Sequence, residues 1–178
     1  MKTPLLAPQP DLDQMSADDL SELVDQGPGL DEAIASHEET PAATLARLSL
    51  SANRAVVRAV MLNPGTPKRI LLAKASKYPR EFLQNPVFVL LLIEEPDLLL
   101  RLPVTAVKSM LRDPQCPAAM IGWALTSNSS SFALALAGSA TASAETLRAV
   151  ARSRHVRAVE LALSRLMKMG LTLEGHDQ

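Results

Sequence analysis

The sequence predicts an all-α fold, built from about five short helical repeats that stack on one another. The first observation is composition: 47% of the 178 residues are hydrophobic but only 3% are aromatic, which suits helices packed by aliphatic side chains better than sheets. The second is a turn phrase that recurs along the chain and each time separates two apolar helical stretches. Such recurrence is typical of repeat arrays, which make binding surfaces rather than enclosed reaction sites.

The turn phrase sets the phase of the predicted repeats. Its copies are HEETP at 37–41, NPGTP at 63–67, NPVFV at 85–89, DPQCP at 113–117 and SATAS at 139–143. The third copy is divergent and depends mainly on Asn85 and Pro86, and the last copy is weaker than the others. We take the last residue of each phrase as the marker of its repeat.

Three columns of residues at fixed offsets from the marker are apolar in every repeat and predict the core. Seven residues before the marker stand Ile34, Val60, Phe82, Met110 and Leu136. Six before it stand Ala35, Met61, Leu83, Leu111 and Ala137. Four after it stand Leu45, Leu71, Ile93, Ile121 and Leu147. Stacked units would bury these columns against one another.

A polar column lies four residues before the marker. It contains His37, Asn63, Asn85, Asp113 and Ser139. These side chains can cap unsatisfied backbone groups where a helix ends and the chain turns. Thr40 and Thr66 precede a marker proline, which predicts a Thr N-cap followed by Pro at the first helical position. The phrase therefore predicts helix ends and starts, and no catalysis.

The same pattern predicts the domain organisation. We expect one helical-repeat domain over residues 16–170, of which 16–36 form an acidic N-terminal cap, between flexible tails at 1–15 and 171–178. Ser16 and Asp19 have capping-box spacing at the start of the first helix, and Gly27-Pro28-Gly29 is expected to end it. Other helices are expected over 41–50, 55–62, 67–76 and 156–169, the last ending at Gly170.

The stretch VVRAVMLNPGTPKRILLAKAS at 56–76 resembles the leucine-rich repeat variant family, and 43–60 and 145–159 fit the second half of its unit. The resemblance extends over about residues 30–165 and implies a right-handed α-solenoid, akin to HEAT-like arrays, of alternating α and 3-10 or short α helices. One type of family member holds an iron–sulfur cluster on a cysteine-rich segment, which is missing here. Residues 77–107 depart from the pattern through Pro79, Pro96 and Pro103, so we expect irregular curvature there.

Charge is distributed unevenly: residues 1–40 carry about −9 and the remainder about +8. The acidic segment could dock on the chain's own basic body, or the body could face an anionic partner. A predicted cationic ladder contains Arg58, Arg80 and Lys108, with Arg157 as a further copy. Each cation could pair with a neighbouring acid or carbonyl, or the row could bind phosphates or an acidic protein.

A second basic cluster lies near the C-terminus. Arg148 and Arg152 share a helix face at i,i+4 spacing, and Arg154 and Arg157 follow them. Nucleic acid would use such charge. However, stacking aromatic residues are few and the net charge of the whole chain is −1, so nucleic-acid binding is an alternative rather than the main hypothesis.

Other residues offer little chemistry. The single cysteine, Cys116, excludes an internal disulfide and a multi-thiolate metal or iron–sulfur site made by this chain alone. A helix start beside it could lower its pKa, although its position matches Thr40 and Thr66. His37, His155 and His176 show no ligand spacing, and no phosphate loop or catalytic triad pattern occurs. We therefore expect no cofactor, no metal and no catalytic residue.

The sequence hence predicts a non-catalytic scaffold or adaptor that binds another protein. The alternative is a binder of nucleic acid or another polyanion through the basic residues, and the third hypothesis is a thiol-dependent enzyme or regulator that uses Cys116. Three prolines interrupt the first ten residues, so a secretory signal is not expected. The longest apolar run, residues 87–93, is too short to span a bilayer. A cytoplasmic location without a membrane partner is expected.

Overall fold

The prediction of an all-α fold is confirmed by the computed structural model, which describes residues 11–173 and contains no strand in that range. The chain divides into two compact units, Met1–Pro96 and Asp97–Gln178, so that the predicted domain over 16–170 spans both. Residues 1–10 and 174–178 of the predicted tails lie outside the described residues. The division falls in the stretch predicted to be irregular, between Pro96 and Pro103.

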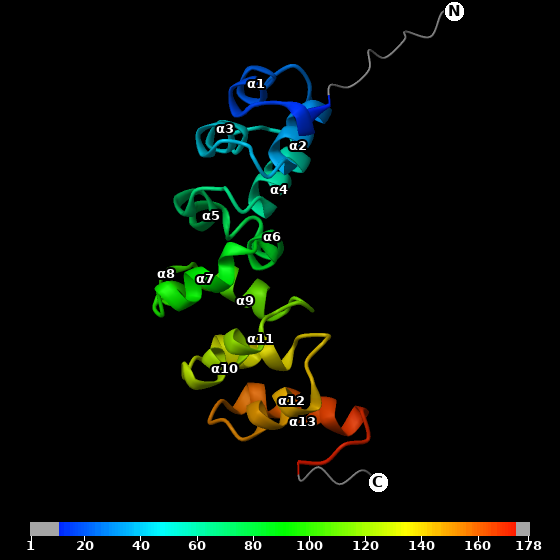
Figure 1. Ribbon diagram of the computed structural model, residues 1–178. Coiled ribbons are helices and arrows are strands. Elements are labelled where there is room, and N and C mark those ends of the chain that lie inside the picture. Colours follow the sequence, from blue (N-terminus) through cyan, green and yellow to red (C-terminus); the bar gives the residue numbers. More distant parts are fainter. Residues whose placement is uncertain (1–10, 174–178) are drawn as a thin grey trace, which may run out of the picture. The chain divides into compact units, whose positions relative to one another are not determined.

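The first unit consists of short helices joined by tight turns. They are η1 (Leu12–Gln14), α1 (Ala17–Glu22), α2 (Pro28–Ser36), α3 (Ala42–Leu48), α4 (Arg54–Leu62), α5 (Lys68–Lys74), α6 (Pro79–Gln84) and α7 (Val87–Glu94). The helices that precede the turn phrases pack in succession, α2 on α4 and α4 on α6 (Figure 1). One residue of a predicted apolar column lies on each of these helices, and Ile34, Val60 and Phe82 all have no exposed surface.

Successive turns of this unit are tied by asparagine side chains of the polar column. Asn63 donates from Nδ2 to the carbonyls of Ala35 and His37, at 2.9 and 2.8 Å. Asn85 repeats the arrangement, donating to the carbonyls of Met61 and Asn63 at 2.8 and 3.0 Å. The carbonyls left without partners at the end of one helix are thus satisfied from the next turn along the chain.

The same column also closes each turn locally. The side chain accepts a hydrogen bond from the N–H two residues ahead through Oδ1 in Asn63, Asn85 and Asp113 and through Nδ1 in His37. This Asx-type turn holds the chain while it changes direction. An asparagine therefore serves two turns at once, because its oxygen closes its own turn while its amide binds the previous one.

The threonines of the phrase have a different role from the predicted N-cap. Thr40 and Thr66 donate from Oγ1 to the carbonyls of Ile34 and Val60, both at 2.5 Å. They seal the end of the preceding helix rather than the start of the next one. The following helices have a proline as N-cap, with no side-chain cap bond, and begin one residue later than predicted.

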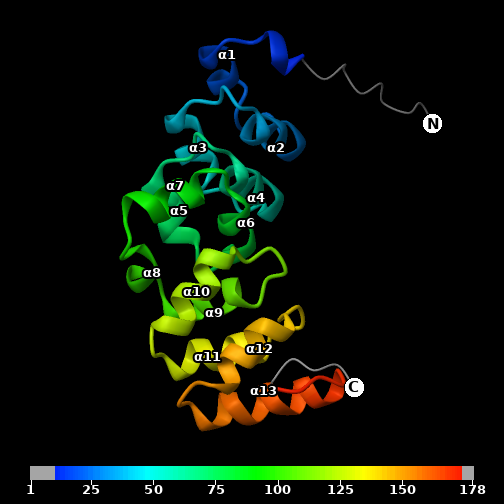
Figure 2. The same cartoon turned by 60° about the horizontal axis from the view of Figure 1, so that its bottom comes forward.

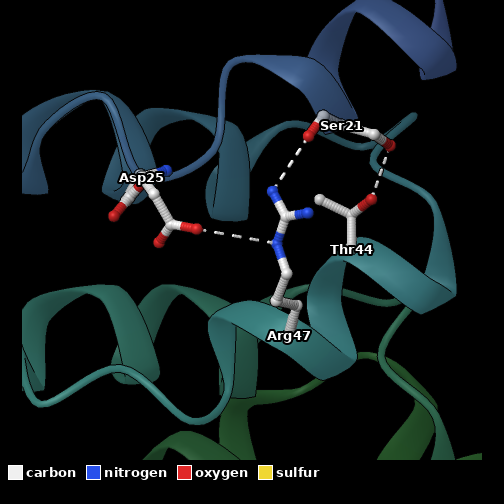
Figure 3. A network of polar contacts seen from close by, with 5 residues as sticks. Ser21, Asp25, Thr44 and Arg47 are labelled. Carbon is white, nitrogen blue, oxygen red and sulfur yellow. Dashed lines mark hydrogen bonds and ion pairs between the residues drawn. The ribbon is translucent and has the colours of Figure 1, made fainter.

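The N-terminal helix is fastened to the first turn-led helix, α3. Figure 3 shows Ser21 bonded to Thr44 across 2.6 Å, while Arg47 donates to the carbonyl of Ser21 at 2.9 Å and lies 4.0 Å from Asp25. Leu20 of α1 is fully buried in a hydrophobic cluster with residues of α2, α3 and α4. The acidic side chains of α1 are therefore displayed on a packed helix.

Two details at this end of the chain differ from the prediction. The predicted capping box of Ser16 and Asp19 is present. However, α1 already ends at Glu22, and Gly27 is the N-cap of α2, so residues 27–29 start a second helix instead of ending the first. Residues 11–15, expected in the tail, pack on the hydrophobic cluster through Leu12 and Met15.

The divergent phrase at 85–89 is only partly a turn. Asn85 makes the bonds described above, but α7 begins directly after Pro86. The helix after the second phrase, α5, instead begins one residue beyond the marker Pro67. Asn85 therefore matches the asparagine of the other phrase, but α7 begins at Val87, before the marker residue Val89.

This early start changes which residues of α7 are buried. Phe88 and Leu91 face the core, whereas Ile93, placed by sequence in the core column, is 72% exposed. The prediction for Ile93 is wrong, because a helix that starts earlier presents other positions to its neighbours. Leu45, Leu71 and Leu147 of the same column are fully buried, and Ile121 is half-buried.

The second unit also consists of short helices joined by turns. Its helices are α8 (Leu98–Arg101), α9 (Val104–Leu111), α10 (Ala118–Thr126), α11 (Ser130–Ala137), α12 (Ala144–Ala151) and α13 (Val156–Lys168). Helix α11 packs on α9 and α13, and α12 lies beside α13 (Figure 2). The predicted core residues Met110 and Leu136 are buried between them.

Arg165 of α13 takes over the task of the asparagines in this unit. Its Nη1 donates to the carbonyls of Ala137, at 2.8 Å, and Ser139. These carbonyls stand six and four residues before the marker, as do the pairs that Asn63 and Asn85 bind. Helix α13 ends as predicted: Gly170 has φ 70°, which favours glycine, and the N–H of Leu171 bonds the carbonyl of Leu166 at 2.9 Å. This is a Schellman end.

Candidate functional site

The predicted cationic ladder separates into residues with different surroundings. Arg58 lies 2.6 Å from the Oε1 atom of Glu81, a carboxylate whose side chain is only 9% exposed. The pair joins α4 to α6. The interpretation that each cation pairs with a neighbouring acid is thereby confirmed for Arg58, which neutralises a carboxylate that would otherwise be costly to bury.

The other ladder residues lie on different helices. Arg80 is exposed in the first turn of α6, in the first unit. Lys108 is half-buried near the end of α9, in the second unit. The ladder as a binding row for phosphates stays a prediction.

Arg148 and Arg152 bind the chain's own C-terminal segment. Nε of Arg148 donates to the carbonyl of Thr172 at 2.9 Å, and Nη2 of Arg152 donates to that of Leu173 at 3.4 Å. Arg148 lies in α12, and Arg152, one turn further on, is the C-cap residue just after this helix. Their contacts hold the segment after α13 against α12.

Arg157 lies at the start of α13, where the structure forms a groove of about 410 Å³ that we call the α13 groove. Ser130, Ser131 and Leu134 of α11 line one side, and residues 154–158 line the other. Within residues 11–173, neither Arg154 nor Arg157 forms an ion pair. The predicted cluster of four arginines is thus divided into two pairs. Arg148 and Arg152 bind the C-terminal segment, whereas Arg154 and Arg157 line the groove.

Helix α7 presents an exposed apolar surface in the first unit, which we call the α7 face. It consists of Val89, Leu90 and Ile93, which are 53%, 57% and 72% exposed. Their spacing of three and four residues puts them on one side of the helix. A helix that is apolar on all sides is normally buried, so an exposed apolar face of this kind marks a surface for contact with another molecule.

Cys116 is a half-buried thiol whose pKa is raised in this fold. Burial, together with the negative charge of Asp113, raises the pKa of Cys116 to about 12. Since the thiolate is the nucleophile, this is the opposite of the shift that a thiol-dependent enzyme needs. Cys116 also lacks the hydroxyl with which Thr40 and Thr66 seal the preceding helix at the same position.

Sequence reasoning identified Arg157 but missed the two surfaces themselves. In the run VFVLLLI at 87–93 the repeat pattern predicts that Ile93 is in the core, and seven consecutive apolar residues do not show which side of the helix stays exposed. Ser130 and Ser131 carry no motif. Their role in the groove depends on α11 and α13 starting side by side.

Two kinds of site are not found within residues 11–173. No helix there combines the length and apolarity needed to cross a bilayer. No three His, Cys, Asp or Glu side chains of this range gather where they could hold a metal ion. Trp123 is half-buried against Phe132, with ring centroids 5.4 Å apart, as part of the packing between α10 and α11.

Comparison of the chain with protein-family models, curated proteins and solved structures finds no match. The resemblance to the leucine-rich repeat variant family stays a prediction.

Proposed function

We propose that this chain is a non-catalytic scaffold or adaptor that binds another protein through the α7 face. The observation that carries the proposal is the exposure of Val89, Leu90 and Ile93 on a helix whose opposite side, Phe88 and Leu91, is packed in the core. The apolar core of a protein interface supplies most of the favourable burial on association. A partner with an apolar patch would remove these side chains from water.

The architecture we propose for this scaffold is a right-handed α-solenoid of about five repeats, acting in the cytoplasm. The repeated bonds of Asn63 and Asn85 support it, because one residue type joins equivalent positions of consecutive turns. Repeat arrays characteristically offer extended surfaces without an enclosed active site. The high pKa of Cys116 argues further against the thiol-enzyme alternative.

The test is a comparison of partners captured from a native lysate by three forms of the chain. The variant Leu90→Asp/Ile93→Asp places two charges on the α7 face. The control Leu50→Asp places one on an exposed leucine, 82% accessible, that lies just after α3. We expect a stoichiometric protein partner that the wild type and the control retain and the double variant loses.

Circular dichroism must show that the double variant keeps its helix content and melting temperature, so that any loss reflects the surface. A partner retained equally by the double variant would contradict binding through the α7 face. A wild type that retains no protein partner would contradict the scaffold function itself.

A further inference from the structure

The α7 face adjoins an acidic side chain that has no counter-charge. Glu94 follows Leu90 by four residues along α7, so the two side chains are neighbours on one side of the helix. Glu94 is exposed, and within residues 11–173 it forms no ion pair. The exposed apolar side chains and an unpaired carboxylate therefore belong to one surface.

The end of α7 concentrates negative charge. The C-terminal end of a helix carries a partial negative charge, which basic residues in the last turn normally offset. Helix α7 has no basic residue in its last turn and ends instead with Glu94, followed by Glu95 as C-cap. Lys68 of α5 pairs with Glu95 and offsets one of the two carboxylates. In the described part of the chain, no cation does the same for Glu94.

The charge of the first unit as a whole has the same sign. Residues 1–96 contain 13 acidic side chains against 9 basic ones. The electric field of such a unit attracts a basic partner and repels an anionic membrane surface. Charge complementarity therefore indicates a partner that combines apolar side chains with Lys or Arg.

The size of the α7 face favours a single helix over a second copy of the chain. A standard protein interface buries about 800 Å² on each partner, whereas even a large aromatic side chain buries only about 150–250 Å². The three partly exposed aliphatic side chains of the face fall short of that area. Pairing of two α7 helices would also bring no cation to Glu94, because α7 contains no Lys or Arg.

We propose that the α7 face binds an amphipathic helix of another protein that carries Lys or Arg beside its apolar stripe. This inference rests on the proposed function and adds the chemistry of the partner. The apolar side chains of the partner helix pack against Val89, Leu90 and Ile93, as the ridges of one helix fit between those of another. Its cation meets Glu94 and offsets the negative end of α7.

The experiment measures the binding of two fluorescent peptides to the full chain by anisotropy. Both peptides have the same leucine stripe on a helix-forming sequence. One carries two lysines beside the stripe, and the other carries two glutamates at the same positions. We expect the lysine peptide to bind the wild type about three- to tenfold more tightly, the range expected where an exposed ion pair replaces a repulsion.

Variants assign this preference to the proposed residues. Glu94→Gln should reduce it to about half its wild-type value or less, because the substitution removes the unpaired carboxylate and keeps the shape of the side chain. The matched control is Glu22→Gln, at an exposed glutamate that is the last residue of α1 as Glu94 is of α7. The control should keep the wild-type preference. Leu90→Asp/Ile93→Asp should bind neither peptide.

The outcomes separate this inference from the proposed function. Equal affinity of the wild type for the two peptides, with both lost in the double variant, would overturn the basic partner and leave binding through the α7 face standing. Lysine-peptide binding that persists in the double variant would contradict the α7 face itself. An equal effect of Glu94→Gln and Glu22→Gln would show a nonspecific charge effect and overturn the inference.

Other occupants of the face would also overturn the inference. A wild type that binds neither peptide, but captures a protein that the double variant loses, would show that the partner is not such a helix. A dimer that the double variant loses in analytical ultracentrifugation would show that a second copy covers the face. Binding to phosphatidylglycerol vesicles that the double variant loses would show that a membrane surface does.

Discussion

The side-chain amide of Asn85 lies 3.0 Å from the main-chain carbonyl oxygen of Asn63, the residue that holds the equivalent position in the preceding turn. Asn63 makes the same bond to the carbonyl of His37 at 2.8 Å. Three turns that are distant in sequence are thereby joined in series. Both asparagines are buried, so their bonds are made away from competing water.

The variant Asn85→Asp tests this series. It keeps the oxygen that accepts from the N–H of Val87 but removes both donors and places a carboxylate beside two carbonyls. We expect a loss of about 3 kcal/mol or more in the free energy of unfolding. Two carbonyl groups lose their hydrogen-bond donor, and the new carboxylate is buried without a counter-charge. Chemical denaturation at neutral pH measures it.

Gln26→Glu is the matched control, an amide-to-acid change at an exposed side chain, and should stay within about 0.5 kcal/mol of the wild type. A loss for Asn85→Asp no larger than that of the control would show that the bonds between turns contribute little.

The Arg58–Glu81 pair predicts a coupled effect. Arg58→Met should destabilise the chain by about 1 to 3 kcal/mol, since Glu81 stays nearly buried while Arg58 itself is half exposed. Arg58→Met/Glu81→Gln should recover much of that loss, because the unpaired charge is gone. Arg54→Met, at an exposed arginine of the same helix, serves as control. Additive losses in the double-mutant cycle would refute the coupling.

Leu20→Ala tests whether α1 is an integral part of the first unit. Leu20 is fully buried in the hydrophobic cluster, so we expect a loss of about 2 to 5 kcal/mol from lost burial and the cavity left behind. Leu50→Ala, at a leucine that is 82% exposed, should change little. If thermal melts of the two variants coincide, α1 does not contribute to the core.

The raised pKa of Cys116 predicts both slow alkylation and an alkaline loss of stability. In the unfolded chain the thiol ionises near 9.0, and in the folded chain only near 12. The folded state therefore binds this proton more tightly, and the associated stability is present below pH 9 and lost as pH rises toward 12. The difference in unfolding free energy between wild type and Cys116→Ala should fall across that range.

Iodoacetamide at pH 8 should label Cys116 much more slowly in the native chain than in urea. Equal labelling rates in both conditions would contradict the raised pKa of the half-buried thiol, and so would a stability difference that stays constant from pH 9 to 12.

Much of the fold could be predicted because its signals are local. Apolar residues at helical spacing placed Ile34, Val60 and Phe82 in the core, and all three are fully buried. Asn-Pro pairs end helices because proline restricts the residue before it, which located the turn after α4. The error at Ile93 arose where α7 starts early, a choice that depends on how the whole helix packs.

The candidate sites were less predictable. Arg157 was singled out by its charge, and Arg148 and Arg152 by theirs, but a sequence does not show which arginine meets a carbonyl. Two of the three are bonded to the C-terminal segment, whereas Arg157 lines a groove. That distinction depends on the path of the chain after α13, which brings Thr172 and Leu173 to Arg148 and Arg152.

By itself, the sequence determined the helical class, the turns and two of the three core columns, because helix periodicity and turn chemistry act over a few residues. Only the tertiary structure decided that Asn85 reaches a carbonyl 24 residues away in sequence, at Met61, and that Ser130 and Arg157 share a groove. The physical reason is that helix ends leave donors and acceptors unpaired. Their partners come from distant segments, and packing alone brings these together.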